Sequence, residues 1–265
     1  MELHAPPRWQ CVDFLSDLHL QASETHTLAA WQHYLQSTVA DAVFLLGDIF
    51  EVWVGDDTLT QPGSFEAQCA DTLRAAAQRL DLHILHGNRD FLMGPALATA
   101  AHMTLLDDPT VLVFADERWV LTHGDALCLD DTDYLQFRAK VRGPDWQRDF
   151  LAKPLAERNA IAHDLRAQSE ARKRSVRVYA DVDTGAALDL LHTHGAHHLV
   201  HGHTHRPATH RLDDTHERLV LSDWDLGATL PRADVLRLRR PAPGAHTAFT
   251  LERIPPAMAG RSGGA

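Results

Sequence analysis

The sequence has few cysteines, no long apolar run and no excess of basic residues, and each lack excludes a class of protein. Its three cysteines (Cys11, Cys69 and Cys128) are far apart and lack CxxC spacing, which indicates reduced, packed thiols rather than disulfides or thiolate metal sites. The sequence contains no run of 18 apolar residues, which a membrane span would need, and the N-terminus does not look like a secretory signal. We therefore expect a cytoplasmic protein. The net charge of -11 argues against a nucleic-acid partner.

The chain is long enough, at 265 residues with 45% hydrophobic composition, for one core that carries an inserted subdomain. Short apolar runs alternate with amphipathic segments in the first half, which predicts an α/β sandwich with a pair of mixed sheets. The predicted strands are Cys11–Leu15, Ala42–Leu46, Leu82–Leu85, Val111–Phe114, Trp119–Leu121, His198–Val200, Arg218–Leu221, Ala233–Leu238 and Thr247–Leu251, and the predicted helices are Thr25–Thr38, Glu66–Arg79 and Pro95–Ala101.

One segment, from about Asp125 to Asp183, lacks the strand pattern. Residues 134–180 look helical, with interruptions at Gly143-Pro144 and at Pro154. Residues 138–177 hold eleven Lys and Arg against five Asp and Glu, a local charge of +6 in an acidic chain. Two interpretations stay open, a solvated helical face or an inserted cap with a basic surface over an anionic ligand.

Five clusters of ligand-type residues each follow an apolar run directly: "FLSDLHL", "LLGDIF", "HGNRD", "LTHGD" and "HGHTH". Asp17 and His19 are two residues apart, as are His201 and His203, so in an extended chain each pair lies on one side. Ligand sites of open α/β sheets lie at the carboxyl ends of strands. We therefore expect the clusters to meet in one site.

The ligand set of these clusters is two aspartates, one asparagine and four histidines. Mixed nitrogen and oxygen ligands without sulfur suit Mn²⁺, Fe²⁺ or Zn²⁺ rather than Ca²⁺. Seven ligands are too many for one tetrahedral ion and suit two ions that share a bridging carboxylate. The seven are Asp17, His19, Asp48, Asn88, His123, His201 and His203.

In this pattern the sequence resembles the calcineurin-like metallophosphoesterases. The stretches "GDIFEVWVGDD", "HGNRDFL", "THGDALCLDDTDY" and "HGHTHRP" resemble, more narrowly, the UDP-2,3-diacylglucosamine hydrolase family. The resemblance implies an α/β fold, a four-layer αββα sandwich over residues 1–240 with a helical cap insertion at about 130–180. Residues 241–265 would form a C-terminal strand and a disordered tail.

The same resemblance implies roles for single residues, beginning with two bound Mn²⁺ ions. Asp17, His19, Asp48 and His203 would hold one ion, Asp48 would bridge, and Asn88, His123 and His201 would complete the second. Substrate contacts would come from Asn88, Arg89, Asp131, Tyr134, Phe137, Ser169, Lys173, Arg174 and His201. Arg89 would stabilise the phosphates, at a position where many members of the superfamily carry a histidine that can protonate an alkoxide leaving group.

The activity that the resemblance implies is hydrolysis of the pyrophosphate bond of UDP-2,3-diacylglucosamine in lipid A biosynthesis. The products would be UMP and 2,3-diacylglucosamine 1-phosphate. The protein would associate peripherally with the inner-membrane lipid surface, without an obligate protein partner. Another dinuclear phosphoesterase, acting on a nucleotide or another phosphodiester, is the alternative. A scaffold that has lost its metals is disfavoured, because all seven ligand positions hold competent residues.

Overall fold

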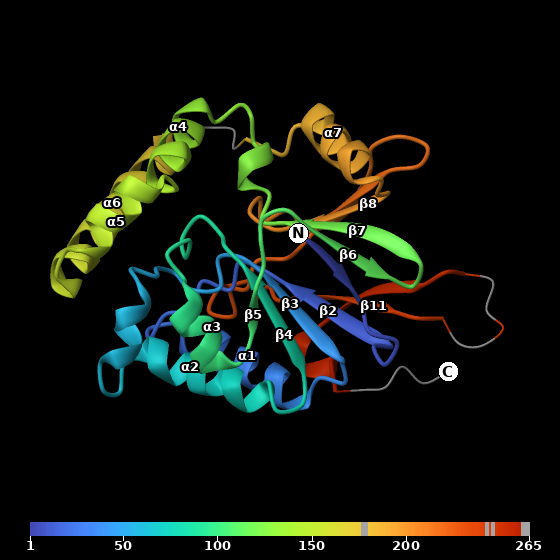
Figure 1. Cartoon of the computed structure of the whole chain (residues 1–265), viewed down its shortest axis with the longest axis horizontal. Coiled ribbons are helices and arrows are strands. Elements are labelled where there is room, and N and C mark those ends of the chain that lie inside the picture. Colours follow the sequence, from blue (N-terminus) through green and yellow to red (C-terminus); the bar gives the residue numbers. More distant parts are fainter. Residues whose placement is uncertain (176–179, 242–243, 245–246, 261–265) are drawn as a thin grey trace.

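Two six-stranded sheets lie face to face in the computed structural model, which describes residues 1–175, 180–241, 244 and 247–260, without the side chains of 169–175 (Figure 1). The first sheet has the order β1 (Glu2–His4), β6 (Thr110–Phe114), β7 (Glu117–Thr122), β8 (His198–His201), β10 (Glu217–Val220) and β9 (Ala208–Arg211). The second has the order β12 (Thr250–Ile254), β11 (Val235–Arg239), β2 (Cys11–Leu15), β3 (Ala42–Leu46), β4 (Asp81–Leu85) and β5 (Thr104–Leu105).

Helices cover both outer faces of the sheet pair. Helices α1 (Thr25–Ser37), α2 (Phe65–Ala76) and α3 (Pro95–Ala101) pack on the second sheet, and α7 (Thr184–His194) packs on the first (Figure 1). Because the central strands are buried on both faces, their sequences are continuous apolar runs. In β2, for example, Val12 and Phe14 face the other sheet, whereas Cys11 and Leu15 face the helices. The layers are helix, sheet, sheet and helix, so the predicted αββα fold is confirmed.

The predicted elements are largely present, with shifted ends and some omissions. The last strand begins at Thr250 rather than Thr247. The sequence pattern does not predict β1, β5, β9 or α7. Helix α7 buries only Ala187 and Leu191, which is too short an apolar stripe to stand out, and β9 is half exposed at a sheet edge.

The segment predicted as a cap holds three helices, α4 (Thr132–Val141), α5 (Pro144–Leu151) and α6 (Leu155–Ser175), which stand beside the two-sheet body (Figure 1). The breaks between them fall at the predicted interruptions, since Pro144 opens α5 and Pro154 precedes α6. Single-turn helices occur at Asp56–Thr60, Asp125–Leu127 and Pro256–Met258. Residues 261–265, the end of the predicted tail, lie outside the described residues. In the part that is described, no helix is long and apolar enough to cross a membrane.

A buried ion pair ties β2 to β11 and to α1. Arg237 donates through Nε and Nη2 to the two carboxylate oxygens of Asp13, at 2.7 Å each. The hydroxyls of Tyr34 and Thr38 donate to the same carboxylate at 2.8 and 2.9 Å. Asp13 is fully buried and Arg237 is 1% exposed, so each charge depends on the other for compensation.

We predict that Arg237→Met lowers the free energy of unfolding by about 3–5 kcal/mol, because it leaves the Asp13 carboxylate buried without its cation. The matched control is Arg239→Met on the same strand, whose partner Glu252 is half exposed. That change should cost about 1 kcal/mol or less. Urea unfolding of both variants measures the difference, and equal losses would contradict the assignment of the pair as a buried anchor.

Candidate metal centre at the strand ends

The ligand-type residues gather where buried strands of both sheets end. Asp17, Asp48 and Asn88 follow β2, β3 and β4, and these three strands are parallel neighbours. His123 follows β7, and His201 ends β8, its parallel neighbour in the other sheet. Because parallel strands end at one edge, five separate sequence motifs come together there.

The backbone at these strand ends is locked in a sparsely populated conformation. Asp17, His19, Asp48, His203 and His205 all have positive φ, between 48° and 67°. Backbone hydrogen bonds hold the turns, since His19 N–H donates to the carbonyl of Asp48 at 3.0 Å. Non-glycine residues with positive φ are uncommon and cluster where side chains are aimed for function.

Close approach of the strand ends also requires glycine at two motif positions. A Cβ on Gly87 would lie 2.2 Å from the backbone nitrogen and from Oδ1 of Asp48. A Cβ on Gly202 would lie 2.2 Å from Oδ2 of Asp17. The glycines of "HGN" and "HGH" therefore make room for the two carboxylates.

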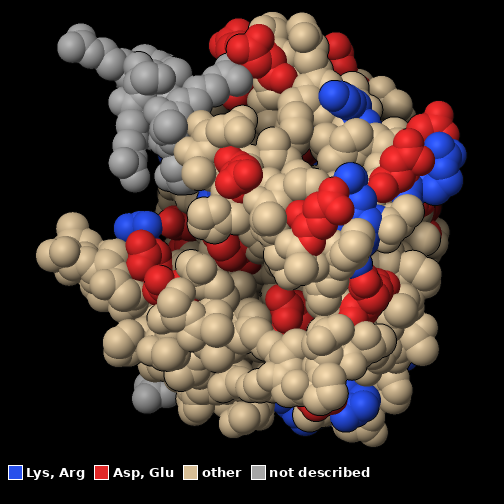
Figure 2. Space-filling model, turned by 90° about the vertical axis from the view of Figure 1, so that its left-hand side faces the viewer, with Lys and Arg blue, Asp and Glu red and all other residues tan. Residues whose placement is uncertain are grey.

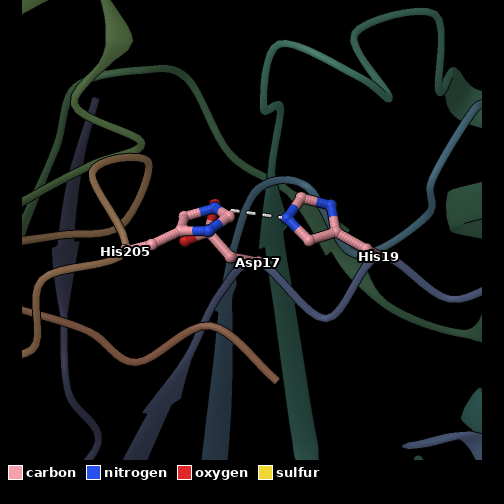
Figure 3. Close-up of side chains that lie close together, drawn as sticks. All are labelled: Asp17, His19 and His205. Atoms are coloured by element: carbon pink, nitrogen blue, oxygen red, sulfur yellow. Dashed lines mark hydrogen bonds and ion pairs between the residues drawn. The ribbon is translucent and has the colours of Figure 1, made fainter. Parts of the chain in front are cut away.

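Two overlapping groups of donor atoms form the centre of the site. Possible ligand atoms of Asp17, His19 and His205 lie within 4.8 Å of one another, and so do those of Asp17, Asp48 and His123. Figure 3 shows His19 and His205 pointing toward each other beside Asp17, with their Nε2 atoms 3.3 Å apart. Asp17 is the residue common to both groups, whereas the family pattern predicts Asp48 as the bridge.

The remaining predicted ligands border these groups. The side-chain oxygen of Asn88 lies 2.8 Å from Nδ1 of His203 and 3.0 Å from Nε2 of His123. His201 is fully buried with its Nδ1 bonded to the carbonyl of Gly202 at 2.7 Å. Thus the structure brings all seven predicted ligand residues to one edge, although it does not assign each of them to an ion.

The donor atoms of the site fit divalent cations. Nδ1 of His19 and Nε2 of His201 are buried and have no hydrogen-bond partner among the described residues. Buried polar atoms in native proteins are nearly always satisfied, so such ring nitrogens beside carboxylates are suited to metal ligation. The donor set of imidazole, carboxylate and amide oxygen, without sulfur, matches first-row divalent ions.

The charges of the site also favour a cation at its centre. Burial opposes a charge on His123, but the carboxylates of Asp48 and Asp17 outweigh it and raise the pKa of His123 to about 9. Burial raises the pKa of Asp48 to about 6. Burial lowers the pKa of His201 to about 4 and that of His203 to about 3, so both are neutral, the form of imidazole that binds metal. His123, in contrast, must release its proton to bind a cation, which would then take the place of that positive charge.

Of the predicted substrate contacts, Arg89 and Tyr134 lie beside this centre, and Phe137 and Asp131 belong to α4 and its cap. Arg89 is 3.4 Å from Asp48, measured from Nε to Oδ2. The ring of Tyr134 stacks near His203 with centroids 6.1 Å apart, and Phe137 is 38% exposed on α4. Asp131 caps α4 by accepting from the backbone of Tyr134 at 3.2 Å. The side chains of Ser169, Lys173 and Arg174 lie outside the described residues.

Two residues of the site are not among the predicted metal ligands or substrate contacts. His205 lies beside Asp17, with Nε2 3.3 Å from Oδ1, and its position two residues after His203 in "HGHTH" is the signal that could have identified it. Glu51 pairs with Arg89 and approaches Nδ1 of His19 at 3.7 Å. Glu51 has no sequence signal, because its partners are distant in the chain.

A separate group of histidines lies away from this centre. Possible ligand atoms of His192, Asp213 and His216 are within 4.8 Å of one another. These residues are near the amino ends of β8 and β10, whereas the site is at the carboxyl end of β8. The group is therefore not part of the site.

Comparison with known proteins points to one family and one activity within it. The model of the calcineurin-like phosphoesterase family matches residues 12–207, a span that contains all seven predicted ligands. A UDP-2,3-diacylglucosamine hydrolase of Chromobacterium violaceum is 45% identical over 226 residues, covering 82% of this chain and 91% of that protein. One of Ralstonia nicotianae is 42% identical over 241 residues, covering 86% and 89%.

One solved structure shows how distant a structural match to this chain can be. A predicted phosphoesterase of Streptococcus pneumoniae TIGR4 is 13% identical and superposes with a TM-score of 0.42, covering 94% of this chain and 100% of that one. The family match and the curated relatives therefore carry the functional argument.

We predict that Asp48→Ala and His123→Ala lose bound divalent metal while the fold survives, because each removes a donor from the same group. Metal analysis of the purified variants measures the loss, with circular dichroism to verify folding. His163→Ala is the matched control, since that histidine side chain is 85% exposed on α6, and its metal content should equal that of the wild type. Unchanged metal content in the two site variants would refute the assignment.

Proposed function

Because the chain belongs to the calcineurin-like phosphoesterase family, we propose that it hydrolyses the pyrophosphate bond of UDP-2,3-diacylglucosamine. The products are UMP and 2,3-diacylglucosamine 1-phosphate, and the reaction is a step of lipid A biosynthesis. The observation that carries the proposal is the 45% identity to the hydrolase of Chromobacterium violaceum across nearly the whole of that protein. The cluster of metal-ligand side chains at the strand ends supports it.

The proposed site holds two divalent cations, as in the family. Asp17, His19, Asp48 and His203 would hold one ion, and Asp48 with Asn88, His123 and His201 would hold the other. His205 lies close enough to Asp17 to orient that carboxylate. Bound cations of this kind supply Lewis acidity, which lowers the pKa of water and offsets charge on phosphoryl oxygens. We propose Mn²⁺ as the metal.

Arg89 is the residue proposed to hold the phosphates. Its guanidinium is 9% exposed beside the carboxylate of Asp48, so it lies at the edge of the ligand groups. Arginine is always charged and offers planar donors that match phosphoryl oxygens. Its contacts to Asp48 and Glu51 use Nε and Nη1, and the contacts among the described residues do not engage Nη2, which we propose for an anion.

An arginine at this position also suits the leaving group. A protonated histidine can supply a proton to an alkoxide, whereas arginine cannot act as an acid in the physiological range. A sugar phosphate released from a pyrophosphate is a weak base and needs little protonation. Arg89 is therefore compatible with a pyrophosphate substrate and poorly suited to a simple alkyl ester.

The cap offers apolar surface for the acyl chains. Leu129, Phe137 and Leu151 are large apolar residues in or next to the cap, and each is at least 38% exposed. Phe150, in contrast, is buried and stacks on Trp146 at 4.7 Å, so those two rings pack the cap itself. Since the substrate is a diacylated lipid, we propose that the protein works at the cytoplasmic face of the inner membrane as a peripheral protein.

We predict that the Mn²⁺-loaded protein converts UDP-2,3-diacylglucosamine to UMP and the lipid 1-phosphate, as followed by phosphorus NMR. Bis(p-nitrophenyl) phosphate and ADP-ribose serve as controls for a general phosphodiesterase or nucleotide pyrophosphatase. Their turnover should be slower by at least about a hundredfold, because they lack the acyl groups that contribute binding energy. Comparable rates on all three would favour the alternative enzyme class.

We further predict that Arg89→His lowers kcat on UDP-2,3-diacylglucosamine by about a hundredfold or more, the usual cost of removing one preorganised charge donor. The variant should lose less activity toward an alkyl phosphodiester, for which a proton donor compensates. The ratio of the two rates is the measurement. Full activity of Arg89→His on the lipid nucleotide would show that arginine is not required for a pyrophosphate.

A further inference from the structure

Glu51 connects the proposed phosphate-binding arginine to the cap. One carboxylate oxygen, Oε2, pairs with Nη1 of Arg89. The other, Oε1, accepts from Arg166 of α6, at 2.9 Å from Nε and 2.7 Å from Nη2. The side chain of Glu51 is only 22% exposed. A single carboxylate therefore joins two arginines that come from different parts of the chain.

The backbone holds Glu51 firmly at this junction. Its N–H donates to the carbonyl of Leu20 at 3.1 Å, in the segment that carries His19. Two residues later, the N–H of Trp53 donates to the carbonyl of Arg89 at 3.2 Å. The loop after β3 and the loop after β4 are thus bonded to each other through both main chain and side chains. These hydrogen bonds fix the backbone of Glu51 relative to Arg89.

Arg89 needs such a partner because a long arginine side chain can adopt many rotamers. A long arginine side chain loses much rotamer freedom when it is ordered, and a preformed hydrogen bond reduces the cost of ordering it at the moment of binding. Asp48 alone lies 3.4 Å from Nε, which is too long for a strong charge-assisted bond. The contact with Glu51 is the closer one, so it decides the direction of the guanidinium.

We propose that Glu51 is a positioning residue: it orients Arg89 toward the phosphates and links that orientation to a cap docked through Arg166. The inference rests on the proposed function, because Arg89 is assigned to the phosphates there. Glu51 itself does not touch the reacting atoms. Glu51 affects turnover by orienting Arg89, so a substitution of Glu51 should matter little in a variant whose residue 89 cannot form this pair.

A second ion pair on the same helix provides a matched control. Arg158 of α6 is 1% exposed, pairs with Asp57 and donates to the carbonyl of Val54. Like Arg166, it anchors α6 to the loop after β3. Unlike Arg166, it pairs with neither Glu51 nor Arg89 in the described part of the chain. A substitution at Asp57 therefore perturbs cap docking without removing the partner of Arg89.

The kinetic test is a pair of double-mutant cycles with UDP-2,3-diacylglucosamine as substrate. Glu51→Gln should lower kcat/KM by about tenfold or more in the wild type, but by less than about threefold in Arg89→Lys, because the shared effect is already lost. Asp57→Asn should lower it by the same factor in both backgrounds. Glu51→Asp, which keeps the charge, should recover part of the loss.

Equal factors for Glu51→Gln in both backgrounds would overturn the proposal. Such a result would mean that Glu51 acts only by docking the cap or through its neighbour His19. The conservative Glu51→Asp variant decides the matter if Glu51→Gln does not fold, since a shorter carboxylate should give the same dependence on Arg89. A loss that is independent of Arg89 in that variant also overturns it.

A measurement without turnover separates this inference from the proposed function. Phenylglyoxal adds to the terminal nitrogens of a guanidinium group, and a carboxylate that occupies those nitrogens hinders the reaction. Mapped by mass spectrometry in the metal-loaded protein, Glu51→Gln should accelerate modification of Arg89, whereas Asp57→Asn should leave Arg89 unchanged and accelerate Arg158. If the wild type fails to hydrolyse the lipid nucleotide, the proposed function is wrong, and these rates alone decide whether Glu51 controls Arg89.

Discussion

The buried carboxylate of Asp90 holds together the two loops on which the site depends. It accepts from the N–H of Gly87 at 2.8 Å in its own loop and from that of Ile49 at 2.8 Å in the loop after β3. Asp48, in the loop after β3, in turn accepts from the N–H of Arg89, in the loop after β4, at 2.8 Å. A charged acceptor of several backbone donors is a strong, buried constraint. Asp48 keeps its left-handed backbone conformation, with φ of 53°, within this network of hydrogen bonds.

The basic residues of the cap are partly explained by the acidic residues around the site. The local +6 of the cap segment left open a solvated face or a surface for an anion, and the contacts of the described residues indicate a third use. Arg138 donates to the buried Asp125 at 2.8 Å, Arg158 pairs with Asp57, and Arg166 pairs with Glu51. Figure 2 shows Lys and Arg lying beside Asp and Glu on this face, outside its grey region. Three arginines of the cap thus pair with acidic residues outside it.

The sequence predicts the site better than it predicts what surrounds the site. Each proposed ligand follows an apolar strand, and parallel strands must end together, so local pattern and topology agree. Helix breaks at Gly143-Pro144 and Pro154 are equally local and were predictable. His205 follows His203 by two residues in "HGHTH", so its place near the site is indicated locally. Glu51 depends on an arginine 115 residues away, so its role does not follow from a local pattern. The assignment of ligands to two ions stays a prediction.

The stretch "HGNRD" combines these constraints in five residues. Gly87 lets the loop approach Asp48, Asn88 faces His123 and His203, and Asp90 closes the backbone network. Of the three polar residues after the glycine, Arg89 is the one whose side chain pairs with Glu51. The same carboxylate also pairs with Arg166 of the cap. An arginine held there can respond to the substrate's phosphates and to the cap at once. A neutral or shorter side chain at this position could not couple the two, because the coupling requires a permanent charge with several donors.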